Sequence, residues 1–208
     1  MNGELAAWAG DLIEAVVGTP AAIVALRVLR RRNVNSWLQL LEDSGRLTSG
    51  DLDRAFQSRP AAAELFATAL DAAARTQQAE RHRLLAGLVV AGLADEHADV
   101  DTLLLLEQVA ERLTDAHIRL LLVAEATPQE LIEGTLGGPV GITDELLAKL
   151  WPQATDVVTP LRLGLEREGL LRDVGAGTYD GLAAQRWVVS DFGQRLIDHY
   201  RSLGREHR

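Results

Sequence analysis

The chain has 208 residues, a formal net charge of −9, 47% hydrophobic and 4% aromatic residues, and no cysteine. This length and hydrophobic content suffice to bury a core without cross-links, which excludes a disordered or fibrous protein. Without cysteine, disulfides, a thiol nucleophile and cysteine-based zinc or iron–sulfur sites are excluded, and we expect a cytoplasmic protein. The negative charge repels nucleic-acid phosphates, so any DNA binding must be local.

The first 113 residues show helical periodicity, with apolar residues three and four positions apart. We expect a first helix over residues 4–17 that ends at Gly18. A second helix should begin at Pro20 after a Thr19 cap, because proline is favoured in a first helical turn. It is predicted to break at Asn33–Asn35 and to bury Ile23, Leu26, Leu29, Trp37, Leu38 and Leu41, before ending at Gly45.

Four further helices complete a predicted all-α bundle over residues 1–113. They are expected over residues 49–56, from Pro60 onward, over residues 76–94 and over residues 99–113, with starts marked by capping residues or proline. Their apolar faces predict a core made of Leu65, Phe66, Ala69, Leu70, Leu84, Leu85, Leu88, Val89, Leu93, Leu103, Leu106, Val109, Ala110 and Leu113.

Residues 12–29 form the most membrane-like stretch, and the basic run Arg30–Arg32 follows them. Glu14, Arg27 and the Gly18–Pro20 break interrupt this stretch, and several of its residues are weakly hydrophobic alanines. We therefore expect buried helices here, and no membrane insertion.

A second domain is predicted over residues 114–208, because the capping pair Thr114-Asp115 starts a new helix directly after Leu113. A short helix is expected after Thr127-Pro128, and a loop over residues 134–141. Another helix should run from Thr143 to Trp151, where Pro152 ends it.

The next predicted helix begins either at Thr155 or, because of Pro160, at Thr159, and ends near Gly169. Strands are expected over residues 170–174 and 185–189, on either side of a glycine-rich stretch, which predicts a hairpin. Ser190-Asp191 then caps a last helix. The predicted fold is therefore mainly α, with a helical bundle followed by a domain that carries a small β-hairpin.

Residues 161–200, LRLGLEREGLLRDVGAGTYDGLAAQRWVVSDFGQRLIDHY, resemble the winged helix-turn-helix domain of bacterial MarR-like and PadR-like regulators. The resemblance extends to the predicted order of three helices, a β-hairpin and a closing helix over residues 114–203, which is somewhat under half of the chain. Residues 161, 165, 169 and 170 match its spacing best. Residues 75–93, RTQQAERHRLLAGLVVAGL, resemble uncharacterised bacterial and phage-borne helical proteins only in outline, which implies no activity.

The winged-helix resemblance implies a non-enzymatic regulator that binds double-stranded DNA as a homodimer. The helix over residues 155–168 would enter the major groove, and the loop over residues 175–181 would lie along the backbone. The residues implied as DNA contacts are Thr155, Thr159, Arg162, Arg167 and Arg172. Because Asp156, Glu166 and Glu168 share this helix, a protein-interaction or oligomerisation module without DNA binding is the alternative. A third is a membrane-associated or phage-defence factor acting through residues 12–29.

Motifs of known enzyme classes are absent from the sequence, including a Walker loop, a dinucleotide-binding glycine fingerprint and an HExxH helix. The acidic stretch Asp95–Asp101 lacks the spacing of a calcium-binding loop, and we interpret it as an interhelical loop in which Asp99 caps the next helix. We therefore predict no catalytic residues, metal or cofactor.

Two isolated histidines have no metal-binding partner in the sequence pattern. His82, between two arginines, is predicted to lie on a solvated helix face, and His117 in the first turn of a helix. Arginines concentrate in two places in the bundle. If the fold brings them together they would form an anionic-ligand site made of Arg30, Arg31, Arg32, Arg81 and Arg83.

Overall fold

The computed structural model describes residues 21–128, 141–174 and 186–203. Several predictions lie outside these residues: the helix over 4–17, the caps at Thr19-Pro20, the short helix after Pro128 and the loop over 175–181. Within the described part the chain is mainly helical, with one small antiparallel two-stranded sheet, as predicted. No described helix is both long enough and apolar enough to cross a membrane.

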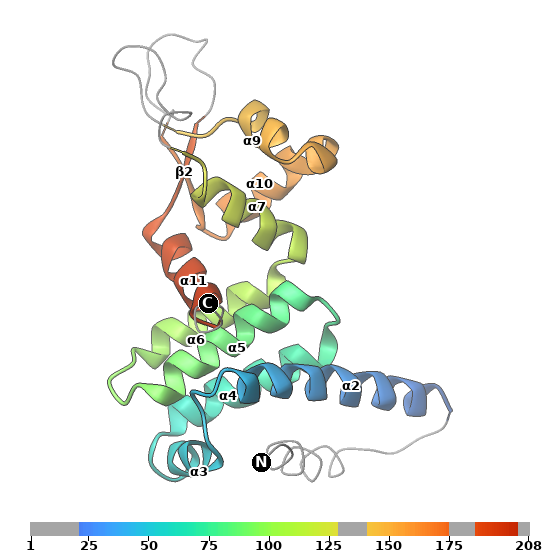
Figure 1. The fold of residues 1–208 in the computed structure, drawn as a ribbon, viewed down its shortest axis with the longest axis vertical. Helices are drawn as coiled ribbons and strands as arrows, with labels where there is room; N and C mark the ends of the chain where they lie inside the picture. The colour runs from blue at the N-terminus through green and yellow to red at the C-terminus, as the bar shows by residue number, and fades with distance from the viewer. Residues whose placement is uncertain (1–20, 129–140, 175–185, 204–208) are drawn as a thin grey trace. The chain divides into compact units, whose positions relative to one another are not determined.

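The chain divides into two compact units (Figure 1). Residues 1–112 and 199–208 form the N-terminal unit, and residues 113–198 form the C-terminal unit. The helices of the N-terminal unit are α2 (Ala21–Asp43), α3 (Ser49–Ser58), α4 (Pro60–Arg75), α5 (Ala79–Ala94) and α6 (Val100–Arg112).

Helix α4 packs against α2, α3, α5 and α6 and so lies at the centre of the N-terminal unit. Small alanines on its buried face let neighbouring helices approach closely, while Leu65 and Phe66 fill the space between them. The core predicted from the apolar faces of α4, α5 and α6 is buried, except that Leu70 is only half-buried. Trp37, Leu38 and Leu41 of α2 are also buried, as predicted.

Helix α2 differs from its prediction in two respects. It continues through Asn33–Asn35, because the buried Asn33 side chain donates from Nδ2 to the Ala74 carbonyl oxygen at 3.1 Å and Val34 joins the core. These tertiary contacts outweigh the low helix propensity of asparagine. Leu29, predicted to face inward, is exposed. The burial of Ile23 and Leu26 lies outside what the structure describes.

Glu107 of α6 is a buried carboxyl group within the N-terminal unit. Its Oε1 atom has no hydrogen-bond partner in the described part of the chain. Burial, together with the nearby Glu111 carboxylate, raises the pKa of Glu107 from 4.5 to about 7, although Arg75 opposes the shift. Glu107 therefore holds its proton in the folded protein at pH values where an unfolded chain has lost it.

The free energy of unfolding should consequently fall as the pH rises from about 4.5 to about 7. Above that range the Glu107 charge should cost on the order of 2 kcal/mol. We expect Glu107→Gln to remove this contribution, so that the variant gains stability over the wild type at pH 8 but not at pH 4.5. Urea denaturation at both pH values measures the difference. Glu96→Gln, in an exposed loop, is the control, and an equal gain in both variants would contradict the assignment.

The C-terminal unit contains a short 3₁₀-helix, η1, beside its α-helices and strands. Its elements are α7 (Asp115–Glu125), α9 (Asp144–Leu150), η1 (Pro152–Val157), α10 (Val158–Arg167), β1 (Leu171–Asp173) and β2 (Trp187–Val189). Helix α11 (Asp191–Ser202) follows, and its residues from His199 onward belong to the N-terminal unit. Threonine caps begin α7 and α9 at the predicted positions, Thr114 and Thr143.

Helix α10 begins at Val158, between the two predicted starts. A start at Thr155-Asp156 would place Pro160 where its missing N–H is needed for a helical hydrogen bond. Starting at Val158 keeps proline in the first turn, where N–H groups have no helical partner. The preceding residues form η1 instead.

The predicted hairpin strands are both present. They pair antiparallel, with Leu171 opposite Val189 and Asp173 opposite Trp187. Gly169, in the left-handed region with φ of 72°, ends α10 and turns the chain into β1. Ile142 forms a β-bridge with Trp187, so that β2 lies between β1 and a third short extended segment.

Candidate functional site

Arg162, implied as a DNA contact by the winged-helix resemblance, is buried in the C-terminal unit, with its side chain only 5% exposed. Its Nε donates to Asp144 Oδ1 and its Nη1 to Glu166 Oε2, both at 2.9 Å. The guanidinium carbon lies 3.8 Å from the centre of the Trp187 ring. The guanidinium thus contacts two carboxylates and an indole. Through these contacts Arg162 connects α9, α10 and β2. This burial and pairing disfavour the contact with DNA that the resemblance implies for Arg162.

The two implied threonine contacts are exposed, but their hydroxyl hydrogens are engaged within the unit. Thr159 Oγ1 donates to Asp144 Oδ2 at 2.7 Å, and Thr155 Oγ1 donates to the Pro152 carbonyl oxygen at 2.9 Å. Asp144 therefore accepts from both Thr159 and Arg162. This shared carboxylate supports the packing of α10 against α9, a role that the sequence pattern did not reveal.

The other two implied contacts, Arg167 and Arg172, lie at the surface. The Arg167 side chain is 77% exposed, with Nε 3.5 Å from Glu168 Oε1, and Arg172 is exposed on β1. Around them the unit is acidic, since residues 113–198 carry 13 carboxylates against seven arginine and lysine side chains. Two exposed arginines in such a field attract DNA only weakly.

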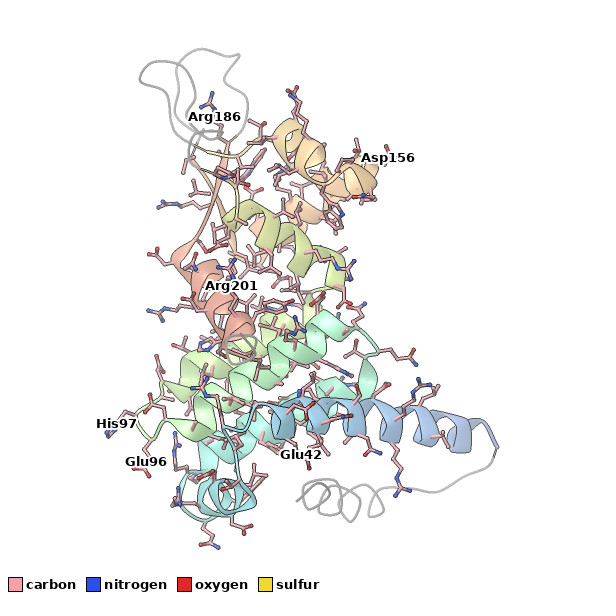
Figure 2. The ribbon with its side chains drawn as sticks, viewed as in Figure 1. Glu42, Glu96, His97, Asp156, Arg186 and Arg201 are labelled. Atoms are coloured by element: carbon pink, nitrogen blue, oxygen red, sulfur yellow. The ribbon has the colours of Figure 1, made fainter. Side chains whose placement is uncertain are left out.

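Six of the exposed residues of η1 and α10 form a surface with an apolar centre, which we call the outer α10 face. Val157 and Leu163 are 46% and 52% exposed. Asp156 projects into solvent (Figure 2). Arg167, the last residue of α10, is also exposed. The face consists of Asp156, Val157, Thr159, Pro160, Leu163 and Arg167. It combines an apolar centre with one charge of each sign, and offers few groups that could read base edges.

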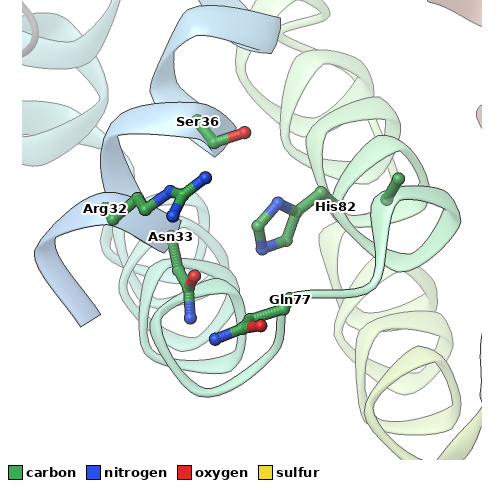
Figure 3. Close-up of a pocket in the computed structure, with 6 residues that line it drawn as sticks. Arg32, Asn33, Ser36, Gln77 and His82 are labelled. Carbon is green, nitrogen blue, oxygen red and sulfur yellow. The ribbon is translucent and has the colours of Figure 1, made fainter. Parts of the chain in front are cut away.

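The N-terminal unit contains a cavity of about 250 Å³, which we call the α2–α5 cavity (Figure 3). Its lining residues are Arg32, Asn33, Ser36, Gln77, Ala79 and His82. His82 is only 4% exposed, so its prediction on a solvated face was wrong. Its Nε2 lies 3.1 Å from the carbonyl oxygens of Ala73 and Thr76, which need donors where α4 ends. Contacts with the end of α4, which the sequence pattern does not indicate, therefore bury this histidine.

Only one of the five arginines considered for an anionic-ligand site lines this cavity, namely Arg32. Arg30 and Arg31 are exposed on α2. Arg83 donates from Nη1 to the Tyr200 hydroxyl oxygen at 3.2 Å, with its guanidinium 5.5 Å from the ring centre. The cavity therefore brings in only one of the five arginines, and the five-arginine site stays a prediction. The sequence pattern missed the polar residues that accompany Arg32, because they share no motif.

The acidic stretch Asp95–Asp101 forms a loop and helix cap, as predicted. Asp99 accepts from the Thr102 backbone N–H and from the Thr102 hydroxyl, at 3.2 and 2.6 Å. Glu96 and His97 project outward from this loop (Figure 2). Across the described ranges, no three histidine or acidic side chains are placed to share a metal ion.

His117 lies in the first turn of α7, as predicted. Its Nδ1 accepts from the Thr114 backbone N–H at 3.2 Å, and its own N–H donates to the Thr114 hydroxyl oxygen. The pair forms a reciprocal cap in which histidine takes the position usually held by an acidic residue. The cap of α7 therefore gives His117 a structural role.

We compared the chain with protein-family models, curated proteins and solved structures, and found no match in any of the three. Function must therefore be inferred from the two features that the geometry singles out. These are the outer α10 face in the C-terminal unit and the α2–α5 cavity in the N-terminal unit.

Proposed function

We propose that this is a non-enzymatic regulatory protein whose C-terminal unit has a winged-helix arrangement and pairs with the same unit of a second copy. The element order supports the arrangement: a helix, an extended segment at Ile142, two helices, a hairpin and a closing helix. The bridge from Ile142 to β2 adds a third extended segment beside the hairpin. Three helices, a hairpin and a closing helix are also the order that the resemblance of residues 114–203 implies.

The outer α10 face is the observation that carries the proposed pairing. Asp156 and Arg167 lie at its two ends, and the apolar Pro160 and Leu163 lie between them. In an antiparallel, two-fold pairing of two such faces, each Asp156 meets the Arg167 of the other copy, and each Pro160 meets a Leu163. A two-fold interface requires this kind of self-complementary surface. Burial of Leu163 and Val157 would supply the favourable free energy.

Major-groove binding is the rival proposal, and two observations disfavour it. The arginine in the middle of α10 is buried between two carboxylates, and the unit has nearly twice as many acidic as basic side chains. A DNA-binding unit instead concentrates cations on one face.

Sedimentation of the full chain over a wide range of concentrations tests the pairing. We expect a reversible monomer–dimer equilibrium for the wild type. Leu163→Asp should weaken association roughly tenfold or more, because it places a carboxylate in the apolar centre. A wild type that stays monomeric at all concentrations contradicts the proposal.

A charge exchange tests the orientation of the pair. Arg167→Asp places acidic residues at both ends and should weaken dimerisation, whereas the double variant Asp156→Arg/Arg167→Asp should restore it. Arg195→Asp, an exposed arginine of α11 away from this face, is the matched control. Equal weakening by Arg167→Asp and Arg195→Asp would show a general charge effect and reject the specific pairing.

Titration with mixed duplex DNA at about 50 mM salt tests the rival proposal of major-groove binding. We expect no binding at micromolar protein. The wild type is then compared with Arg167→Ala by the slope of log affinity against log salt concentration. If DNA binds and the substitution lowers that slope by about one unit, the outer α10 face contacts phosphate, and the DNA proposal replaces the pairing.

A further inference from the structure

We propose that the α2–α5 cavity binds a small oxyanion that retains a hydroxyl group, of which hydrogen phosphate is the simplest example. This site lies within the N-terminal unit, so the inference is independent of the proposed pairing of the C-terminal unit. No residue that lines the cavity carries a carboxylate, although the chain as a whole is acidic. Arg32 supplies a positive charge, and Ser36 and Gln77 supply further hydrogen-bond donors.

The beginning of α5 adds to the positive character of the cavity. This 16-residue helix starts at Ala79, which lines the cavity, and no side chain of the preceding residue Gln78 caps it. Backbone N–H groups in a first helical turn have no helical partner, and the helix dipole makes this end favourable for anions.

His82 makes the site more specific than a positive patch. Because carbonyl oxygens only accept, its contacts with the Ala73 and Thr76 carbonyls place the ring hydrogen on Nε2. This tautomer leaves Nδ1 as an acceptor, on a side chain that is more than nine-tenths buried and lines the cavity. Figure 3 shows the imidazole projecting from α5 into the space that faces Arg32, Asn33 and Ser36 of α2. An acceptor that lines a cavity can receive a hydrogen bond from a ligand that carries a hydroxyl group.

These groups together suit a ligand that has both anionic oxygens and a hydroxyl group. Arg32 and the start of α5 suit the anionic oxygens, and His82 Nδ1 suits the hydroxyl. Hydrogen phosphate has both at neutral pH, whereas sulfate has the same tetrahedral shape but no hydrogen to donate. The cavity volume, about 250 Å³, lies below the ~300–1,000 Å³ typical of sites for drug-sized ligands and favours a small ion.

Isothermal titration of the full chain with inorganic phosphate, and separately with sulfate, tests the assignment. We expect phosphate to bind more tightly than sulfate, by roughly tenfold, because only phosphate can donate to His82 Nδ1. Equal affinities for the two anions would reject the role of Nδ1. No binding of either anion would reject the site.

Arg32→Ala should weaken phosphate binding roughly tenfold to a hundredfold, since it removes the only charged group in the lining. Arg31→Ala is the matched control, because Arg31 is the exposed neighbour on the same helix and does not line the cavity. Equal effects of the two substitutions would show that phosphate responds only to the general charge of α2, which overturns the proposal. Ser36→Ala, a small change at an exposed position, should weaken binding without unfolding the bundle.

Discussion

Replacing Arg162 with alanine should lower the free energy of unfolding of the C-terminal unit by about 3 kcal/mol. The substitution leaves Asp144 and Glu166 without the guanidinium that both contact at 2.9 Å. Because these carboxylates are 28% and 38% exposed, water compensates part of the loss, which puts the effect near the lower end for a broken buried ion pair. The Trp187 ring also loses the group stacked on it. Urea denaturation followed by tryptophan fluorescence measures the change.

Two further substitutions distinguish this structural role from a surface charge. Arg167→Ala should change stability by less than about 0.5 kcal/mol, because its side chain is largely exposed. Arg162→Lys should recover only part of the loss, since an ammonium group cannot bond two carboxylates in a fixed plane while stacking on an indole. If Arg162→Ala and Arg167→Ala have the same small effect, Arg162 does not hold α9, α10 and β2 together.

The elements that sequence predicted well are those fixed by local chemistry. Thr114 and Thr143 cap their helices through bonds to backbone N–H groups three residues ahead, and these signals are complete within one turn. Pro60 begins α4 and Gly45, with φ of 63°, follows the end of α2 for equally local reasons. The hairpin strands lie within the predicted ranges because β-branched and aromatic residues concentrate there.

The features that sequence did not predict depend on contacts between distant residues. Asn33 is helical because its amide bonds to Ala74, 41 positions away. Arg162 is buried because Asp144, 18 positions earlier, comes to lie beside it. For His82, the carbonyl partners are nearer, but only the packed end of α4 presents them. In each case the residue type is equally compatible with solvent exposure. Neither composition nor hydrophobic periodicity therefore indicates that these residues are buried.

The two candidate sites also differ in how far the sequence predicted them. The helix over residues 155–168 was predicted as a DNA-binding surface, but Arg162 is buried, and the exposed face around Leu163 has an apolar centre. The α2–α5 cavity was anticipated only through Arg32, one of five arginines. Its other lining residues come from two segments some 40 positions apart, and no sequence motif joins Ser36 with Gln77 or His82.

The substitution Trp37→Ala should destabilise the N-terminal unit by about 3–5 kcal/mol, the range for removal of a large aromatic side chain from a packed core. Trp37 is completely buried on α2, and its ring centre lies 5.7 Å from that of Phe66 on α4. Deleting the indole removes this contact and leaves a cavity between two helices that depend on each other for burial. Thermal or urea unfolding followed by circular dichroism measures the loss, and a change below about 1 kcal/mol would contradict the packing described here.

Trp37→Phe should cost far less than the alanine substitution, for a reason specific to this position. The indole Nε1 is buried and has no hydrogen-bond partner within the described residues, so the wild type already bears the cost of an unsatisfied donor. Phenylalanine keeps one aromatic ring against Phe66 and removes that donor, so the two effects partly offset each other. We expect a net loss of about 1 kcal/mol or less. If Trp37→Phe is instead as damaging as Trp37→Ala, the Nε1 hydrogen must bond to a group in the folded protein, and the indole serves as more than an apolar wedge between α2 and α4.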